Sequence, residues 1–450
     1  MRAGEILLVS TYELGHQPSG ITLPKAFLER AGFRPTALDL AVEAFDEERV
    51  KAARLVAFSV PMHTALRLAL HALERVRSVN PSAALVFHGL YAVLHTPLLR
   101  SLGATAVLAG ECEEELVALA RAAREDRDPL PLSTTRVARL DYPVPSREGL
   151  PGPERYARLV DRDGRERLAG HAESTRGCRH WCRHCPIPPV YRGRFFAVPT
   201  DVVLADVAQQ VAAGATHITF GDPDFLNGPS HALRVASALH SRFPHVTFDF
   251  TAKIEHLVRH AGSLPALSAA GAIFVVSALE SLSDLVLAKL DKGHRRADVP
   301  RAFEACRAAG LVLRPSLVPF TPWSSLDDYL DLLDAFVREG WLRALDPVQL
   351  SIRLLIPPGS LLLDDPELVT DGFDPVALTH RWRHPDPRMD QLHAKVARVV
   401  EDAAVQRTET SMTFDRIRRL ALASAGRPHE HVVSADTGRR APRLTESWFC

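Results

Sequence analysis

Three cysteines lie close together near the middle of the chain, in the stretch GCRHWCRHCPIPP. They are Cys178, Cys182 and Cys185, so three thiolates can reach one metal centre from a single short loop. Thiolates at such spacing bind zinc or an iron–sulfur cluster. A structural zinc ion needs four protein ligands, and His180 or His184 could supply the fourth. Both kinds of metal site are therefore open at this point.

Two features of this loop favour an iron–sulfur cluster over zinc. Structural zinc sites usually pair two separated knuckles, whereas the cysteines here share one compact loop. The loop also follows the first strand of an α/β region, at the end of a barrel where active sites gather. Three thiolates on a [4Fe-4S] cluster leave one iron free to bind a cofactor or a substrate. We therefore predict an open [4Fe-4S] site, with zinc as the alternative.

The barrel expected to hold this loop covers residues 167–360. Short apolar runs alternate there with amphipathic stretches, which is typical of strands and helices in series. One such helix, at residues 200–214, begins with a threonine and ends at a glycine, as capped helices do. Six βα units in series indicate a partial (β/α)6 barrel, whose predicted strands are residues 168–175, 217–221, 246–252, 272–277, 311–318 and 348–355.

A second α/β unit is expected before the barrel, over residues 1–124. Helical patterns at residues 63–79 and 112–124 separate or follow its apolar runs. This alternation predicts a doubly wound, Rossmann-like domain with a ligand site at the carboxyl ends of its strands. The predicted strands are residues 5–10, 54–60, 84–89 and 105–110.

The rest of the chain is less regular. Residues 125–166 are rich in proline and charge and have little apolar periodicity, so we expect a linker between the two units. Residues 361–450 are expected to form a mainly helical C-terminal extension, with helices at residues 388–405 and 412–424.

The composition excludes several classes of protein. Lysine and arginine total 54 and aspartate and glutamate also total 54, so no net charge directs the chain to nucleic acid or to anionic lipid. The amino-terminal residues run into an apolar strand without a cleavage site, and no stretch is long enough to span a bilayer. Six cysteines, three of them in one loop, do not make a disulfide framework. We expect a reduced, cytoplasmic protein with one metal site and no nucleic-acid or membrane partner.

The segment STRGCRHWCRHC resembles the signature of the radical S-adenosylmethionine (SAM) superfamily, a CxxxCxxC motif after the first strand of a partial barrel. The resemblance implies that the amino and carboxylate groups of SAM bind the free iron of the cluster. It also implies that an electron from the cluster cleaves SAM to give a 5′-deoxyadenosyl radical, which takes hydrogen from a substrate. The protein then positions the cofactors and excludes competing chemistry.

The same resemblance implies SAM contacts elsewhere in the barrel. In the turn FGDPDF, Gly221 would allow close backbone approach, and Asp222 or Asp224 would bind the amino group. Glu280, in VSALES, would contact the ribose or the amino group. His184 stands where the superfamily usually has an aromatic residue over the adenine, and an imidazole can still stack there. The alternative for each acid is a residue that caps the following helix.

The first unit resembles the cobalamin-binding module of one branch of this superfamily, most clearly in its closing AGECEEELVAL. It lacks the D-x-H-x-x-G motif whose histidine binds cobalt in other cobalamin proteins, and this branch commonly lacks that motif. The alternative is a degenerate Rossmann-like unit kept for structure or substrate contact. If cobalamin binds, the resemblance implies contacts with its corrin and nucleotide tail from Ser59, Val60, Pro61, Met62, Gly89 and Gly110.

The last residues of the chain, RLTESWFC, end in Cys450. They resemble the tail of a radical SAM subfamily named for the sequence Cys-Cys-Ala-Glu-Pro or Cys-selenocysteine-Ala-Glu-Pro. The resemblance extends to CRHWCRHCPIPPVYRGRFF and IRLLIPPGS. It predicts a chain cut at a selenocysteine codon that was read as a stop, and the alternative is an ordinary terminus. The nucleotides that follow codon 450 distinguish the two.

Together these resemblances imply a radical SAM enzyme that uses a [4Fe-4S] cluster, SAM and cobalamin to transfer a methyl group to an unactivated carbon. A second interpretation keeps the radical chemistry with a degenerate cobalamin unit and gives a rearrangement, an oxidation or a selenium- or sulfur-linked reaction. A third is a non-catalytic zinc or iron–sulfur protein. The substrate would be a small molecule or a peptide, and the reducing partner a flavodoxin or ferredoxin.

Overall fold

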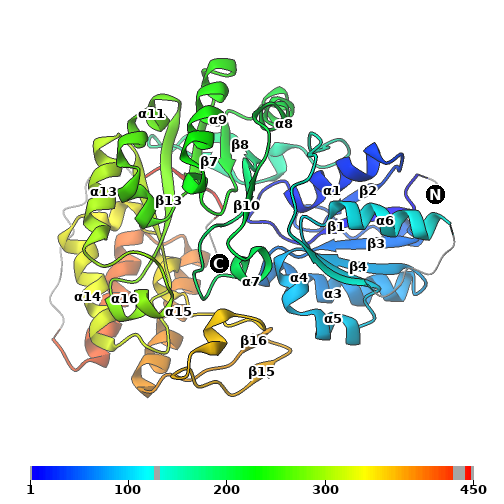
Figure 1. The fold of residues 1–450 in the computed structure, drawn as a ribbon. Coiled ribbons are helices and arrows are strands. Elements are labelled where there is room, and N and C mark those ends of the chain that lie inside the picture. Colours follow the sequence, from blue (N-terminus) through cyan, green and yellow to red (C-terminus); the bar gives the residue numbers. More distant parts are fainter. Residues whose placement is uncertain (1–2, 126–131, 429–440, 447–450) are drawn as a thin grey trace.

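The computed structural model of the chain describes residues 3–125, 132–428 and 441–446 (Figure 1). Two α/β units lie next to each other, the first drawn in blue and cyan and the second mainly in green and yellow. Each unit has a largely parallel sheet with helices packed against it. The doubly wound unit and the partial barrel predicted from the sequence are therefore both present.

The first unit is built on a six-stranded parallel sheet with the order β2-β1-β3-β4-β5-β6. Its central strands are short apolar runs that are buried on both faces, as expected for a parallel sheet covered by helices. The strands are β1 (Ile6–Ser10), β2 (Thr36–Asp39), β3 (Leu55–Ser59), β4 (Ala84–His88), β5 (Ala106–Gly110) and β6 (Leu132–Arg136). The helices are α1 (Ser19–Arg30), α2 (Glu47–Ala52), α3 (His63–Val79), α4 (Leu90–Leu94), α5 (Thr96–Ser101) and α6 (Glu113–Arg124).

The second unit is a curled, open half-barrel with the strand order β14-β13-β12-β11-β8-β7-β17. Its first five strands in this order are parallel, and β7 and β17 continue the sheet in antiparallel fashion. The strands are β7 (Arg158–Val160), β8 (Glu166–Ala172), β11 (His217–Phe220), β12 (Thr247–Thr251), β13 (Ala272–Glu280), β14 (Val312–Leu317) and β17 (Arg443–Leu444). A separate antiparallel pair, β9 (Thr175–Gly177) and β10 (Phe195–Ala197), encloses the cysteine loop.

Helices cover the outer face of the half-barrel (Figure 1). They are α8 (Thr200–Ala212), α9 (Pro229–Arg242), α10 (Ile254–Arg259), α11 (Leu264–Ala269), α12 (Asp284–Lys289), α13 (Asp298–Ala308) and α14 (Leu326–Arg338). The short helix α7 (Ile187–Tyr191) lies instead between the two units and packs against β5. Short 3₁₀ helices lie at η1 (Pro153–Arg155), η2 (Phe225–Asn227), η3 (Ala261–Ser263) and η4 (Trp341–Ala344).

Two predicted segments differ from the structure. The linker predicted at residues 125–166 contains β6, β7 and the start of β8, so both sheets reach into it. The sixth barrel strand, predicted at residues 348–355, is instead a 3₁₀ helix, η5 (Pro347–Ser351), followed by one parallel bridge between Phe320 and Arg353. Pro347 has no N–H to donate to a strand, and Asp346 caps the helix by accepting a hydrogen bond from the next free N–H.

The C-terminal extension is mainly helical, as predicted, and contains a small hairpin. Its elements are η6 (Leu361–Asp364), β15 (Phe373–Asp374), β16 (Thr379–His380), α15 (Pro387–Gln406) and α16 (Thr410–Ser424). The hairpin contacts the first unit, since His63 Nε2 lies 2.9 Å from the carbonyl oxygen of Ala377. Cys450 lies outside the described residues. Among the residues that are described, no helix is both long and apolar enough to cross a membrane.

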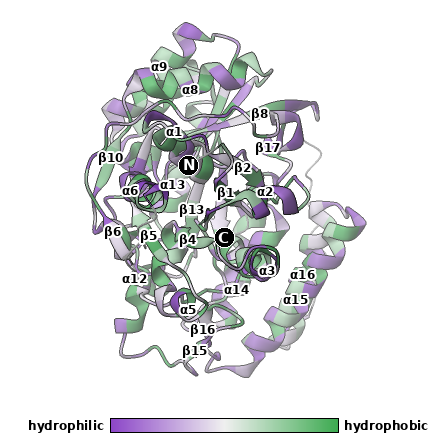
Figure 2. Cartoon of the chain, turned by 90° about the vertical axis from the view of Figure 1, so that its right-hand side faces the viewer, coloured by the Kyte–Doolittle hydropathy of each residue, from purple (hydrophilic) through white to green (hydrophobic). Residues whose placement is uncertain are grey.

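The two units share one continuous apolar core, which includes Leu108 of the first sheet and Phe220 of the second. In Figure 2 the outer helices are mixed purple and green along their length, as expected of helices with one buried face. A buried arginine, Arg147, also joins the units. Its guanidinium donates to both carboxylate oxygens of Asp206 (2.6 and 2.8 Å) and to Gln17 Oε1 (2.5 Å). The units are therefore packed as one body around their interface.

Candidate active site

A cavity of about 520 Å³ lies between the two units. Residues at the carboxyl ends of parallel strands line it from both sides, for example Ser59 and Gly110 from the first sheet and Glu280 from the second. Open α/β folds bind their ligands at this edge of the sheet. The three cysteines of the loop line the same cavity. The cysteine loop and the ligand site of the first unit, which were predicted separately from the sequence, therefore face the same cavity.

The cysteine loop is held in place by contacts with the barrel and the C-terminal extension. The backbone N–H of Arg183 donates to the carbonyl of Leu290 (2.9 Å), and its guanidinium donates to Asp365 Oδ2 (3.1 Å). Within the loop, the N–H of Cys185 donates to the carbonyl of Cys182 (3.1 Å) and closes a turn. Arg183 thus anchors the loop both to the barrel and to the C-terminal extension.

The thiols of the loop suit a metal centre that replaces their protons. Burial raises the pKa of Cys178, and burial together with the neighbouring thiols raises that of Cys185 to about 12. Without a cation these thiols stay protonated at neutral pH, and a bound metal supplies the positive charge that stabilises thiolates. Three thiolates from one loop are the donor set of a [4Fe-4S] cluster with one open iron. The residues therefore fit that cluster.

Neither histidine of the loop joins the three thiols as a fourth metal ligand. His184 Nε2 lies 3.3 Å from Glu280 Oε1. His180 belongs instead to a group with Asp224 and His256, which is the one set of three potential metal ligands found within mutual reach among the described residues. The fourth ligand that a structural zinc ion needs is therefore not placed at the cysteines.

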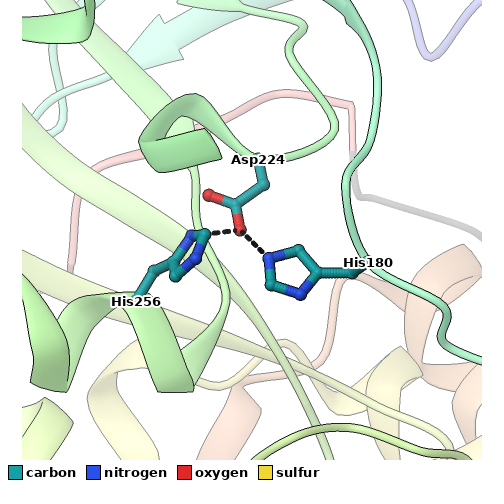
Figure 3. A group of neighbouring side chains, drawn as sticks. All are labelled: His180, Asp224 and His256. Carbon is teal, nitrogen blue, oxygen red and sulfur yellow. Dashed lines mark ion pairs between the residues drawn. The ribbon is translucent and has the colours of Figure 1, made fainter. Parts of the chain in front are cut away.

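Figure 3 shows His180, Asp224 and His256 pointing toward one another beside the cysteine loop. His256 Nδ1 lies 2.8 Å and His180 Nε2 3.7 Å from Asp224 Oδ2. On the other side of the His180 ring, Lys253 Nζ lies 3.1 Å from Nδ1. A lysine ammonium only donates hydrogen bonds, so Nδ1 accepts and Nε2 carries the proton toward Asp224. The three facing atoms, His180 Nε2, Asp224 Oδ2 and His256 Nδ1, form no hydrogen bond in the described chain, and together they are a set of potential metal ligands separate from the cysteines.

Four of the five residues assigned to SAM line the cavity, namely Gly221, Asp222, Glu280 and His184. Asp224 does not line it, because its fully buried carboxylate is turned toward the two histidines of Figure 3. Of the two acids offered by the turn after β11, the structure thus brings only Asp222 to the cavity.

Asp222 fastens the turn after β11 to the segment that leads into the cysteine loop. Its carboxylate accepts hydrogen bonds from the N–H of Ser174 (2.9 Å), the hydroxyl of Ser174 (2.7 Å) and the hydroxyl of Thr175 (2.5 Å). Burial nevertheless raises the pKa of Asp222 to about 6. The side chain therefore links the two parts of the site that the resemblance assigns to SAM and to the cluster.

Glu280 carries a charged carboxylate at the end of β13. A register shift between Ala278 and Glu280 accompanies a left-handed φ of +64° at Glu280, which is costly for a residue with a side chain. Lys292 Nζ lies 3.0 Å from Oε1. Although burial opposes ionisation, Lys292 and then His184 lower the pKa of Glu280 to about 2. A charged acceptor held in a strained backbone conformation fits the predicted contact with SAM.

Gly221 leaves no room for a side chain. A Cβ there would lie 2.1 Å from Nε2 of His171, whose ring is held by stacking on His16 and by Ser19 Oγ at 3.0 Å. We expect Gly221→Ala to lower the free energy of unfolding by about 1–3 kcal/mol, as overpacked sites do, and to weaken SAM binding. Thermal unfolding and equilibrium binding of SAM measure the two effects. In the control Gly228→Ala the new Cβ meets nothing closer than 3.5 Å, so equal losses in both variants would contradict this account.

Five of the six residues assigned to cobalamin line the cavity, namely Ser59, Pro61, Met62, Gly89 and Gly110. The exception is Val60, whose side chain is fully buried in the core of the first unit. Successive side chains of an extended segment point in opposite directions, so Val60 cannot face the cavity together with both of its neighbours.

Gly89 and Gly110 stand where only glycine fits. Their φ angles are +114° and +71°. A Cβ would lie 2.8 Å from the carbonyl oxygen of Val60 in the first case and 2.0 Å from that of Arg136 in the second. The chain therefore presents bare backbone to the cavity at both places, which suits close approach by a large ligand.

Residues 172–333 match the family profile described as the radical SAM superfamily. This barrel is a radical SAM domain. The chain is accordingly that of an enzyme, and the family implies that the domain uses an iron–sulfur cluster and SAM. No match is found among curated proteins.

Solved structures resemble the chain over both units. TsrM from Kitasatospora setae, a radical SAM methyltransferase solved with cobalamin and a [4Fe-4S] cluster, has a TM-score of 0.56 and 18% identity over 75% of this chain and 70% of its own. OxsB, a cobalamin-dependent SAM radical enzyme solved with aqua-cobalamin and SAM, has a TM-score of 0.68 and 14% identity over 88% of this chain and 66% of its own. These likenesses show that the chain has the fold of cobalamin-dependent radical SAM enzymes.

Several residues that line the cavity between the radical SAM domain and the first unit were not predicted from the sequence. His16 is an example, since it is one of 20 histidines and no spacing marks it. The only signal in the sequence was its place in the loop directly after an apolar strand, where ligand sites of α/β folds occur. The unpredicted residues include Glu13, His16, His171, Glu173, Arg176, Lys253 and Lys292.

Proposed function

We propose that this chain is a cobalamin-dependent radical SAM enzyme that transfers a methyl group to an unactivated carbon. The observation that carries the proposal is the shared cavity, which has the cysteine loop on one side and the carboxyl ends of the first sheet on the other. The fold likeness to TsrM, described as a methyltransferase, and to OxsB, described as cobalamin-dependent, supports the same use of the two units.

The residues that would hold each cofactor surround this cavity. The cluster would be held by Cys178, Cys182 and Cys185, SAM by Gly221, Asp222, Glu280 and His184, and cobalamin by Ser59, Pro61, Met62, Gly89 and Gly110. When bound, the cluster supplies the electron for cleavage of SAM, and cobalamin supplies a carrier for the methyl group. The protein keeps Glu280 charged through Lys292 and holds the cysteine loop through Arg183.

We further propose that the substrate is a small molecule or a peptide side chain and that the electron donor is a flavodoxin or ferredoxin.

Cobalamin dependence is tested by anaerobic purification of the full chain from cells supplied with hydroxocobalamin. We expect corrin absorbance in proportion to protein, and both S-adenosylhomocysteine and 5′-deoxyadenosine on addition of SAM and reductant. Gly89→Val should lose cobalamin and keep iron, because its side chain would meet the Val60 carbonyl at the cavity edge. If wild-type protein forms 5′-deoxyadenosine without corrin absorbance or S-adenosylhomocysteine, the methyl transfer and the cobalamin site are wrong and the radical SAM activity stands.

A further inference from the structure

One wall of the cavity carries an excess of carboxylates. Glu13 comes from the loop after β1, Glu113 from the start of α6 and Glu173 from the residue after β8, and all three line the cavity. We call these three residues the acidic wall. They belong to neither the cysteine loop nor the turn after β11, so the cluster and the SAM contacts proposed above do not use them.

The acidic wall has too few cations to balance it. Its neighbour Arg176 donates to Glu113 Oε1 (2.6 Å) and lies 3.1 Å from Glu111 Oε1, so this guanidinium is already shared by two carboxylates. Glu173 is half-buried, lines the cavity, and forms no hydrogen bond or ion pair with any described residue. The charge of Arg176 also acts on Glu173, so one guanidinium is shared by Glu111, Glu113 and Glu173.

Glu13 and Glu173 affect each other through their charges. Glu13 accepts hydrogen bonds from the N–H groups of Ser19 (2.8 Å) and Gly20 (3.2 Å) at the start of α1. Burial and then the charge of Glu173 nonetheless raise the pKa of Glu13 to about 8. Burial likewise raises the pKa of Glu173 to about 7. Two carboxylates in this state are stabilised by a positive group that enters the cavity.

One buried atom of the wall and one buried atom elsewhere in the lining of the cavity lack partners, which points independently to a ligand. Glu113 is only 3% exposed, and its Oε2 has no hydrogen-bond partner. His16 is 6% exposed, lines the cavity, and has no partner for Nε2. Leaving a buried polar atom unpaired costs about 1–3 kcal/mol, so native sites of this kind are normally completed by another group.

We propose that the acidic wall binds a cationic group of the substrate, a primary ammonium or a guanidinium. The proposal rests on the proposed function only in that the substrate enters this cavity. An ammonium offers N–H donors to carboxylate oxygens and supplies the missing charge. An organic cation fits better than a metal ion, because within the described chain no three of these side chains converge as metal ligands.

The probes are cadaverine and agmatine, with 1,5-pentanediol as the neutral counterpart, added to the full chain after anaerobic reconstitution of its cluster. Binding is followed by isothermal titration. We expect both cations to bind and pentanediol not to bind measurably. In Glu173→Gln the dissociation constant for the cations should rise by about 10- to 100-fold, as for the loss of a charge-assisted hydrogen bond. The matched control is Glu114→Gln, a neighbour of Glu113 that pairs with Arg136 and does not line the cavity.

A second measurement keeps the proposal testable if the variants differ in folding. Glu173→Gln should raise the melting temperature of the ligand-free protein, because it removes one of three carboxylates that share a single guanidinium, and cadaverine should raise the melting temperature of the wild type. Equal binding of cadaverine and pentanediol, or unchanged cation binding in Glu173→Gln, would overturn the proposal. A Glu173→Gln variant that binds SAM more weakly but binds the cations as before would also overturn it, since the wall would then bind the ammonium group of SAM. If the protein binds no cobalamin, in contrast, the proposed methyl transfer is wrong and the proposed cation binding is unaffected.

Discussion

Cys182→Ala is expected to lose the iron–sulfur cluster and to form no 5′-deoxyadenosine above background. Wild-type protein should hold about four iron atoms per chain after anaerobic reconstitution, and the variant close to none. The reason is the donor set, since the three thiolates of one loop would hold the cluster and two of them cannot. Iron analysis, the visible absorption spectrum and chromatography of the nucleoside product measure the effect.

The matched control for this variant is Cys306→Ala. Cys306 is also a buried thiol with a pKa raised by burial to about 12, but it lies in α13 within the apolar core. Its replacement removes one sulfur from the core and should cost about 1 kcal/mol of stability. Iron content should not change. If Cys182→Ala keeps all of its iron, or if Cys306→Ala loses it, the assignment of the ligands is wrong.

Arg147→Met is expected to lower the free energy of unfolding by about 3–5 kcal/mol, the cost of breaking a buried ion pair by removing one partner. The variant leaves Asp206, only 3% exposed, without a counter-charge. It also removes hydrogen bonds to Gln17 in the first unit and to the carbonyl of His171 in β8. Because these contacts join the two units, the midpoint of urea unfolding should fall.

Two comparisons separate this effect from the loss of any arginine. The double variant Arg147→Met with Asp206→Leu should recover much of the stability, since it leaves no buried unpaired charge. Arg307→Met removes an exposed partner of Glu304 and should change stability by no more than about 0.5 kcal/mol. A double variant as unstable as the single one would mean that the pairing with Asp206 is not the source of the loss.

The parts of the fold that follow from local sequence were predictable. Buried parallel strands appear as short apolar runs, so four strands of the first unit and five of the barrel could be located. The short edge strand β2 and the strand β6 were not, because neither is a continuous apolar run and each is defined by pairing with a neighbour. The prediction of a sixth barrel strand was wrong for a local reason, since Pro347 and the cap from Asp346 favour a helical turn.

The site could be predicted only where a motif marks it. The spacing of Cys178, Cys182 and Cys185 shows directly in the sequence, and the structure brings all three to one cavity. The choice between Asp222 and Asp224 could not be made, because both are acids in one turn and only packing decides which one faces Ser174 and which one faces His256.

The acidic wall could not be predicted for a different reason. Glu13, Glu113 and Glu173 come from three separate segments of the chain, and each alone is an ordinary acid next to a strand or at a helix start. Their meeting depends on how the first unit packs against the barrel, which no local pattern reports. Glu13 and Glu113 follow predicted strands, where ligand sites of α/β folds occur, whereas Glu173 falls inside the strand predicted at residues 168–175 and follows β8 only in the structure.

The central claim is that the cysteine loop holds a cluster that cleaves SAM, and one measurement tests it most directly. The full chain is reconstituted anaerobically with iron and sulfide, reduced with dithionite and incubated with SAM. The account predicts a brown protein whose thiolate-to-iron absorption bleaches on reduction, and 5′-deoxyadenosine that forms only when the cluster, the reductant and SAM are all present. A colourless protein that retains stoichiometric zinc at the loop and forms no 5′-deoxyadenosine would contradict it.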